Sequence, residues 1–352
     1  MKSFTKLYIP IALETLCYML AGMVDTIMLS TVGDNAVGAV GTANTYINVF
    51  IIMFHVVSSG MIAVMTQYIG AKRIGIAYQA RQLGAVFNAV LGFALSIFLF
   101  VFSGKILEIV GVAPLLMEYA KTYLKIVGGC CFLNALIPIF SSYLRAFGYT
   151  KQPLIATLVA NGVNLGLNAV FLFGLHAGVA GVAWATVLSR ILNLGIVIVV
   201  SKLLVKAKED PERLKNREVF AQIIKVGLPS ALETALYNVA MTLTIRFMNQ
   251  MDEFGFNVTA RAYAAQIANF SYCAGAALAQ ANAIMTGWRI GEGDYEACDK
   301  GTKKAACIGI FVAAGLETLF VLSADVLIRI FTEDLEMIRL VKTLLAIDIM
   351  LE

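Results

Sequence analysis

Long apolar runs fill most of this chain, and polar residues gather in short connections between them. Each run reaches the ~20 residues that an α-helix needs to cross ~30 Å of hydrocarbon. Transmembrane β-strands are about 10 residues long and alternate in polarity, so the runs predict helices and not a barrel. Ten runs are predicted to span a membrane: residues 7–30, 41–68, 84–103, 115–142, 153–175, 180–201, 222–249, 258–286, 302–324 and 335–352.

The chain contains an internal repeat. Residues 10–15 read Pro-Ile-Ala-Leu-Glu-Thr and residues 229–234 read Pro-Ser-Ala-Leu-Glu-Thr. A second echo pairs residues 66–70, Thr-Gln-Tyr-Ile-Gly, with residues 287–291, Gly-Trp-Arg-Ile-Gly. Matching at so long a period indicates a duplicated architecture. A proline inside a helix removes a hydrogen bond, so the first residue of each copy predicts a helix bend, at Pro10 and Pro229.

Positive charge is concentrated in every second connection. The basic residues are Lys72, Arg73 and Arg81; Arg145 and Lys151; six between 202 and 217; and Arg289, Lys300, Lys303 and Lys304. By the positive-inside rule these connections and the amino terminus are cytoplasmic. Six crossings return the chain to its starting side, so the two copies have the same orientation.

This pattern predicts an all-α integral membrane protein built from two parallel-repeat lobes. Residues 1–200 form an amino-terminal lobe of six helices, 201–220 a cytoplasmic linker, and 221–352 a carboxyl-terminal lobe in which four helices are visible. Because a second copy of the same lobe would have six helices, we expect twelve in the full-length protein and a chain that is truncated at its carboxyl end.

Composition agrees with a membrane protein, since 59% of the residues are hydrophobic and 14% are charged, against roughly 25% charged in soluble domains. The first run is too long and too acidic for a signal peptide. The six cysteines lack C-x-x-C spacing and the two histidines lie far apart, which predicts no metal site. We find neither a catalytic motif nor a nucleic-acid-binding patch, so we expect no enzyme and no nucleic-acid partner.

Two acids lie in the first run, Glu14 and Asp25, nearly three helical turns apart and therefore on one face. The fifth run carries a polar stripe at helical spacing: Thr157, Asn161, Asn164 and Asn168. Such oxygen ligands suit a hard cation or a proton relay beside a carboxylate. Ordinary hydrogen bonding between membrane helices explains the stripe equally well.

Polar and aromatic residues on the first, second, seventh and eighth runs predict a water-filled substrate cavity between the halves. Its predicted lining is Glu14, Tyr18, Asn44, Asn48, Glu233, Tyr237, Gln266 and Asn269.

Several ordered segments resemble the multidrug and toxic compound extrusion (MATE) family of secondary transporters. They are residues 10–25 followed by Met-Leu-Ser-Thr-Val-Gly at 28–33, Thr-Gln-Tyr-Ile-Gly-Ala at 66–71, and 164–174 followed by Gly-Val-Ala-Trp-Ala-Thr at 181–186. The resemblance covers essentially the whole chain.

The resemblance implies two lobes that alternate access and expel amphipathic, often cationic, small molecules in exchange for H⁺ or Na⁺. It implies a monomer in the cell (inner) membrane that needs no cofactor beyond the coupling cation. It also implies a cation site at Asp25, Asn164, Asn168 and Thr186. Many members have Asp where this chain has Asn168, so this site has one carboxylate fewer.

The alternative is a flippase for lipid-linked oligosaccharides or lipids within the same superfamily. A pyrophosphate cargo would require several cavity Arg or Lys residues. The predicted cavity helices instead offer Glu14, Asp25 and Glu233, which favours cationic cargo, and Arg190 is the exception.

Overall fold

A computed structural model describes residues 3–109, 111–112, 114–205, 212–251, 256–329 and 334–348. The predicted all-α fold is confirmed, since helices make up nearly all of these residues. The helices are α1 Phe4–Ser30, α2 Asp34–Gly70, α3 Ile74–Ile109, α4 Pro114–Tyr123, η1 Leu124–Gly128, α5 Phe132–Ala146, α6 Lys151–Ala169, η2 Val170–Gly174, α7 Gly178–Leu204, α8 Asn216–Met251, α9 Phe256–Glu292, α10 Tyr295–Leu322, α11 Ala324–Ile328 and α12 Leu335–Asp348.

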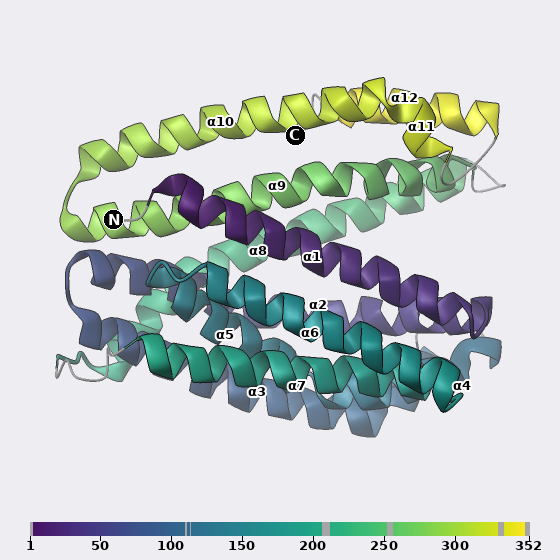
Figure 1. Cartoon of the computed structure of the whole chain (residues 1–352), viewed down its shortest axis with the longest axis horizontal. Coiled ribbons are helices and arrows are strands. Elements are labelled where there is room, and N and C mark those ends of the chain that lie inside the picture. Colours follow the sequence, from purple (N-terminus) through teal and green to yellow (C-terminus); the bar gives the residue numbers. More distant parts are fainter. Residues whose placement is uncertain are drawn as a thin grey trace.

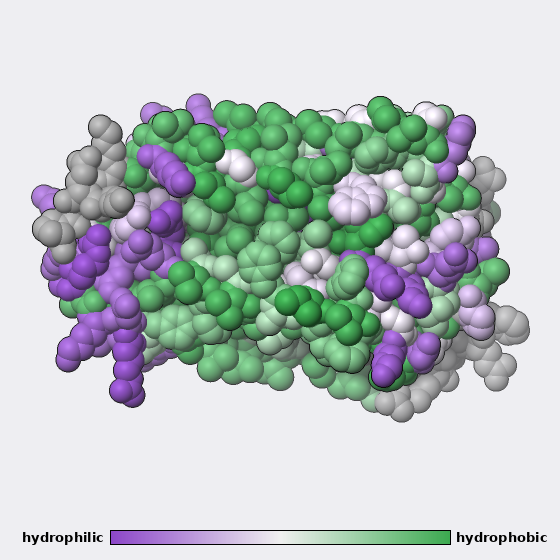
Figure 2. Space-filling view, turned by 90° about the horizontal axis from the view of Figure 1, so that it is seen from below, coloured by the Kyte–Doolittle hydropathy of each residue, from purple (hydrophilic) through white to green (hydrophobic). Residues whose placement is uncertain are grey.

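The long helices run along one axis of the molecule, and their connections alternate between its two ends (Figure 1). Apolar side chains form a broad band between two polar ends (Figure 2). Within the described residues, six helices are long and apolar enough to cross a membrane, and two bent pairs would raise the number to eight. Ten spans were predicted; α9 is not among those that qualify, and the described part of α12 has only 14 residues.

The predicted helix over 115–142 is wrong in one respect, because the segment is broken. Residues 114–128 and 132–146 meet at an angle of 43°. The break lies at two adjacent glycines that pack against α3. A Cβ atom on Gly128 would lie 3.3 Å from the Leu99 Cβ, and one on Gly129 would lie 3.1 Å from the Phe100 ring. The absence of side chains here allows close packing that would otherwise be crowded.

Helices also extend beyond the apolar runs into the polar ends. α3 begins at Ile74, so Arg81 lies on a helix and not in a connection. Its guanidinium stacks over the rings of Tyr78 and Tyr143 at 4.6 and 5.0 Å. The predicted linker is shorter than expected, because α7 continues to Leu204 and α8 starts at Asn216. Residues 206–211 lie outside the described part, and the division into lobes at 201–220 stays a prediction.

The helices fall into two groups in chain order, α1–α7 and α8–α12, and the first helix of each group crosses to the other group: α1 lies along α9, and α8 lies along α2 and α3 (Figure 1). α1 packs on both α6 and α9. Its contact with α9 is an apolar cluster of Leu7, Ile11, Ala277, Ala281, Ile284 and Trp288. Pro10 and Pro229 lie inside α1 and α8, which continue through them, so the predicted bends stay predictions.

The two groups meet closely at the end predicted to be cytoplasmic. A side chain on Gly70 would overlap the backbone of Trp288, and one on Gly291 would overlap the backbone of Gln67. These contacts are reciprocal, because Gly70 and Gly291 occupy matching positions in the second sequence echo. The Trp288 Nε1–H adds a hydrogen bond of 2.9 Å to the Ala146 carbonyl. The repeat therefore forms a tightly packed seal at this end.

Candidate functional site

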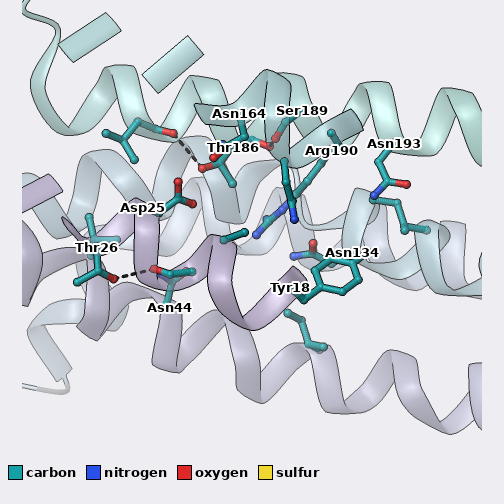
Figure 3. A pocket seen from close by; sticks show the side chains of 18 of the residues that line it. Tyr18, Asp25, Thr26, Asn44, Asn134, Asn164, Thr186, Ser189, Arg190 and Asn193 are labelled. Carbon is teal, nitrogen blue, oxygen red and sulfur yellow. Dashed lines mark hydrogen bonds between the residues drawn. The ribbon is translucent and has the colours of Figure 1, made fainter. Parts of the chain in front are cut away.

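A cavity of about 670 Å³ lies among the amino-terminal helices, lined by α1, α2, α5, α6 and α7 together with Tyr123. Polar side chains project into it from several of these helices (Figure 3). They include Asp25, Asn44, Asn134, Asn164, Thr186 and Arg190. The predicted cavity was expected between the two halves, but this one lies within the first.

Asp25 is half-buried on the face of α1 that packs against α6. The Asn168 amide donates to Asp25 Oδ1 at 2.7 Å and to Asn164 Oδ1 at 3.2 Å. The two asparagines are four residues apart and therefore share one face of the helix. Asn168 Oδ1 is buried and has no hydrogen-bond partner among the described residues. The structure thus brings together the carboxylate and two amides of the predicted cation site.

Thr186 approaches this cavity from α7, and its hydroxyl donates to the Val182 carbonyl at 2.9 Å. Its oxygen can still accept or coordinate. Carboxylate, amide and hydroxyl oxygens are ligands for hard cations. No group of three His, Cys, Asp or Glu residues that could hold a metal occurs in the described ranges. The oxygen set is chemically suited to one proton or one monovalent cation.

Glu14 is fully buried, and its charge is already paired. Glu14 Oε1 lies 2.7 Å from Arg145 Nη2, and Arg145 Nη1 donates to Gln280 Oε1 at 2.9 Å. Arg145 was predicted in a connection, but it lies in the last turn of α5 with a side chain that is 13% exposed. A buried carboxylate without a partner is strongly destabilising, which explains the pairing. The acidic trend expected of the cavity helices does not hold for this cavity, because its lining contains two carboxylates, Glu14 and Asp25, and two guanidiniums, Arg145 and Arg190.

The other predicted cavity residues divide into two sets. Tyr18 and Asn44 line the cavity with Glu14. Four are exposed and do not line it: Asn48, Glu233, Tyr237 and Asn269. The side chain of Gln266 lies outside the described part of the chain.

The sequence analysis did not identify a polar stripe on α7. Thr186, Ser189, Arg190 and Asn193 all line the cavity. Their spacing of three, one and three residues places them on one helical face, so the same periodicity test that found the α6 stripe could have found this one. Arg190 had been noted only as an exception to the acidic trend.

A model of the MatE family matches residues 10–170 and 229–352. This chain belongs to the MatE family. The two matched segments start at Pro10 and Pro229, the first residues of the two repeat copies, which agrees with duplication. MatE relatives are transporters, and the predicted class of multi-pass membrane transporter is confirmed at that level.

Curated MatE relatives match nearly all of this chain. It is 31% identical over 349 residues to the uncharacterized transporter YisQ of Bacillus subtilis, covering 97% of this chain and 76% of that protein. It is 27% identical over 367 residues to the probable multidrug resistance protein NorM of Thermotoga maritima, and the match covers 97% of this chain and 74% of that protein.

Solved MatE structures share the fold. A multidrug resistance MATE family transporter of the MOP superfamily in an outward-facing conformation superposes with a TM-score of 0.87 at 21% identity, over 97% of this chain and 77% of that one. A MATE structure in complex with MaD5 gives a TM-score of 0.89 at 22% identity, over 98% of this chain and 79% of that one.

Proposed function

We propose that this MatE protein is a secondary active antiporter that exports amphipathic organic compounds with a cationic group in exchange for H⁺ or Na⁺. The names of its relatives, among them probable multidrug resistance proteins, support the cargo class. The cavity adds apolar walls from Val37, Ile51 and Val182 beside its polar groups. Such mixed walls suit an amphipathic molecule.

The observation that carries this proposal is the 2.7 Å hydrogen bond between Asn168 and Asp25 at the cavity wall. Asp25 is reachable from the cavity and has oxygen-rich neighbours, so one carboxylate can serve either the coupling cation or the ammonium group of the cargo. Two ligands that compete for one charge cannot be bound there at the same time, and antiport requires this competition. A ligand shifts a conformational equilibrium only through different affinities for the two states.

Antiport also requires that only one end of the cavity be open at a time. The seal formed by Gly70, Gly291 and Trp288 closes the space between the two groups of helices at the end where the basic connections gather. We propose that this end faces the cytoplasm of the cell (inner) membrane, that the amino terminus lies on that side, and that one monomer transports. A flippase of lipid pyrophosphates is less well supported, because Arg145 is committed to Glu14 and leaves Arg190 alone to bind the anion.

The test is efflux of tetramethylrhodamine methyl ester, a fluorescent cation, from proteoliposomes under an imposed pH or Na⁺ gradient. We expect gradient-driven efflux by the parent chain and none by Asp25→Asn. Asp299→Asn is the matched control, because Asp299 is an exposed acid paired with Lys303 on α10, far from the cavity lining. Efflux by Asp25→Asn with unchanged pH and Na⁺ dependence would contradict the assignment of Asp25.

A further inference from the structure

After pairing, two opposite charges remain in the cavity. Glu14 and Arg145 neutralise each other at 2.7 Å, which leaves Asp25 on α1 and Arg190 on α7. Both residues line the cavity, yet they form no ion pair within 4.0 Å. Figure 3 shows Arg190 reaching into the space that also receives Asp25 and Asn134. A space bounded by a separated acid and base therefore lies within the cavity.

Arg190 has no hydrogen bond or ion pair to any of the described residues, although it is half-buried. A guanidinium stays charged under all ordinary conditions, and its planar fork of donors matches a carboxylate. Asn134 and Asn193 contribute further amide groups to the same wall. The arrangement provides donors for an anionic group of a ligand.

We propose that Arg190 binds a carboxylate of the cargo while Asp25 binds its cationic group, so that the cavity selects zwitterionic amphipathic compounds. This inference rests on the proposed function and specifies its substrate class. A purely cationic cargo would satisfy Asp25 but would face an unpaired guanidinium, which repels it. A purely anionic cargo would face the opposite problem at Asp25. A zwitterion satisfies both charges at once.

The coupling cycle follows from this division of roles. H⁺ or Na⁺ at Asp25 removes the partner of the cargo's cationic group and leaves the carboxylate held by Arg190 alone. The cargo loses one of two attachments and dissociates more readily. Arg190 therefore acts in cargo recognition, whereas Asp25 acts in both recognition and exchange.

The test compares two probes that differ only at the carboxylate: tetramethylrhodamine, a zwitterion, and its methyl ester, a cation. We measure the affinity of the full chain for each by fluorescence polarisation. In the parent chain we expect the zwitterion to bind about tenfold more tightly than the ester, which corresponds to ~1.4 kcal/mol. Arg190→Gln should bring this ratio close to one, because it weakens binding of the zwitterion and relieves the repulsion of the ester. Arg190→Lys should retain part of the ratio.

Lys202→Gln is the matched control, since it removes one positive charge from the same helix at an exposed position outside the cavity. It should leave the ratio unchanged. A ratio that is the same in Arg190→Gln and the parent, or a parent that prefers the ester, overturns the inference. Arg190→Gln binding both probes more tightly would show that Arg190 is only a counter-charge for Asp25, and would overturn it as well. If the parent chain still shows gradient-driven efflux of the ester, these outcomes overturn only the zwitterion inference and leave the proposed antiport intact. If the parent shows no such efflux, the proposed function and the inference are both overturned.

Discussion

Arg145 lies 2.7 Å from the buried carboxylate of Glu14 and also donates to Gln280 at 2.9 Å. The three residues belong to α5, α1 and α9. The guanidinium of Arg145 therefore links Glu14, in the first copy of the repeat, to α9, the helix that follows the second copy. The link lies beside the seal of Gly70, Gly291 and Trp288, because the neighbouring carbonyl of Ala146 accepts the hydrogen bond of Trp288.

We predict that Arg145→Gln lowers stability by about 3–5 kcal/mol, the cost of leaving a buried charge without its partner. The double variant Glu14→Gln/Arg145→Gln should regain most of this loss, because no unpaired charge remains. Thermal unfolding of the purified variants in detergent measures both effects.

The control for that prediction is the exposed pair of Glu296 and Lys300 on α10, whose side chains are 80% and 74% exposed. Lys300→Gln should cost less than about 1 kcal/mol, because water screens exposed pairs. If Arg145→Gln cost no more than Lys300→Gln, the buried pair would not be a stabilising link.

Trp288→Phe should retain most of the packing against Leu7 and Ile11 but lose the hydrogen bond to Ala146. The expected loss is about 1 kcal/mol, the usual net value of one hydrogen bond. The measurement is the melting temperature of the parent chain and of Trp288→Phe, each with and without tetramethylrhodamine methyl ester. A larger loss would mean that ring packing also fails in this variant.

Gly291→Leu should separate α9 from α2 at the seal, because even a Cβ at this position overlaps the Gln67 backbone. Trp288, which is 7% exposed, reports the change. In a Trp184→Phe background, its emission should shift to longer wavelength and become accessible to iodide quenching. Gly315→Leu on α10 faces open space and should leave the emission unchanged. Equal quenching in both variants would contradict the seal.

Asn168→Asp should raise the affinity of the site for Na⁺ about tenfold, or ~1.4 kcal/mol, since a second charge strengthens oxygen coordination of a hard cation. Calorimetric titration of the purified chain with NaCl measures this. Asn161→Asp adds the same charge two turns earlier on α6, where the native amide bonds the Cys17 carbonyl. It should have a much smaller effect, and an unchanged Na⁺ affinity in Asn168→Asp would argue against coordination at Asp25.

Local pattern predicted two parts of the arrangement at Asp25, the shared face of the α6 asparagines and the need of the carboxylate for polar neighbours. Asn164 and Asn168 share a face of one helix by spacing alone, and a carboxylate in an apolar run requires polar neighbours. The contact between Asp25 and Asn168 links residues far apart in sequence. The spacing of the polar residues did not distinguish ion binding from helix packing. The expectation that Asp25 pairs with these asparagines came from the resemblance to MATE proteins.

The pairing of Glu14 with Arg145 could not be predicted in the same way. Positive charge near the end of an apolar run usually belongs to a connection, so Arg145 was placed there. Only the packing of α5 against the other helices decides that its side chain turns inward, because burial is a property of neighbours and not of local sequence. The same reason explains why Asn48 and Glu233 were expected in a cavity that they do not line.

By itself, the sequence determined the helical class, the duplication and the end at which basic connections gather. The length of each hydrophobic run and the charges beside it are local properties of the sequence, and they decide which segments can cross a bilayer and in which direction. The tertiary structure alone decided where the helices break, which glycines seal one end and which charges cancel. Those outcomes depend on distances between residues far apart in the chain, such as the 2.7 Å between Glu14 and Arg145, and no local pattern encodes them.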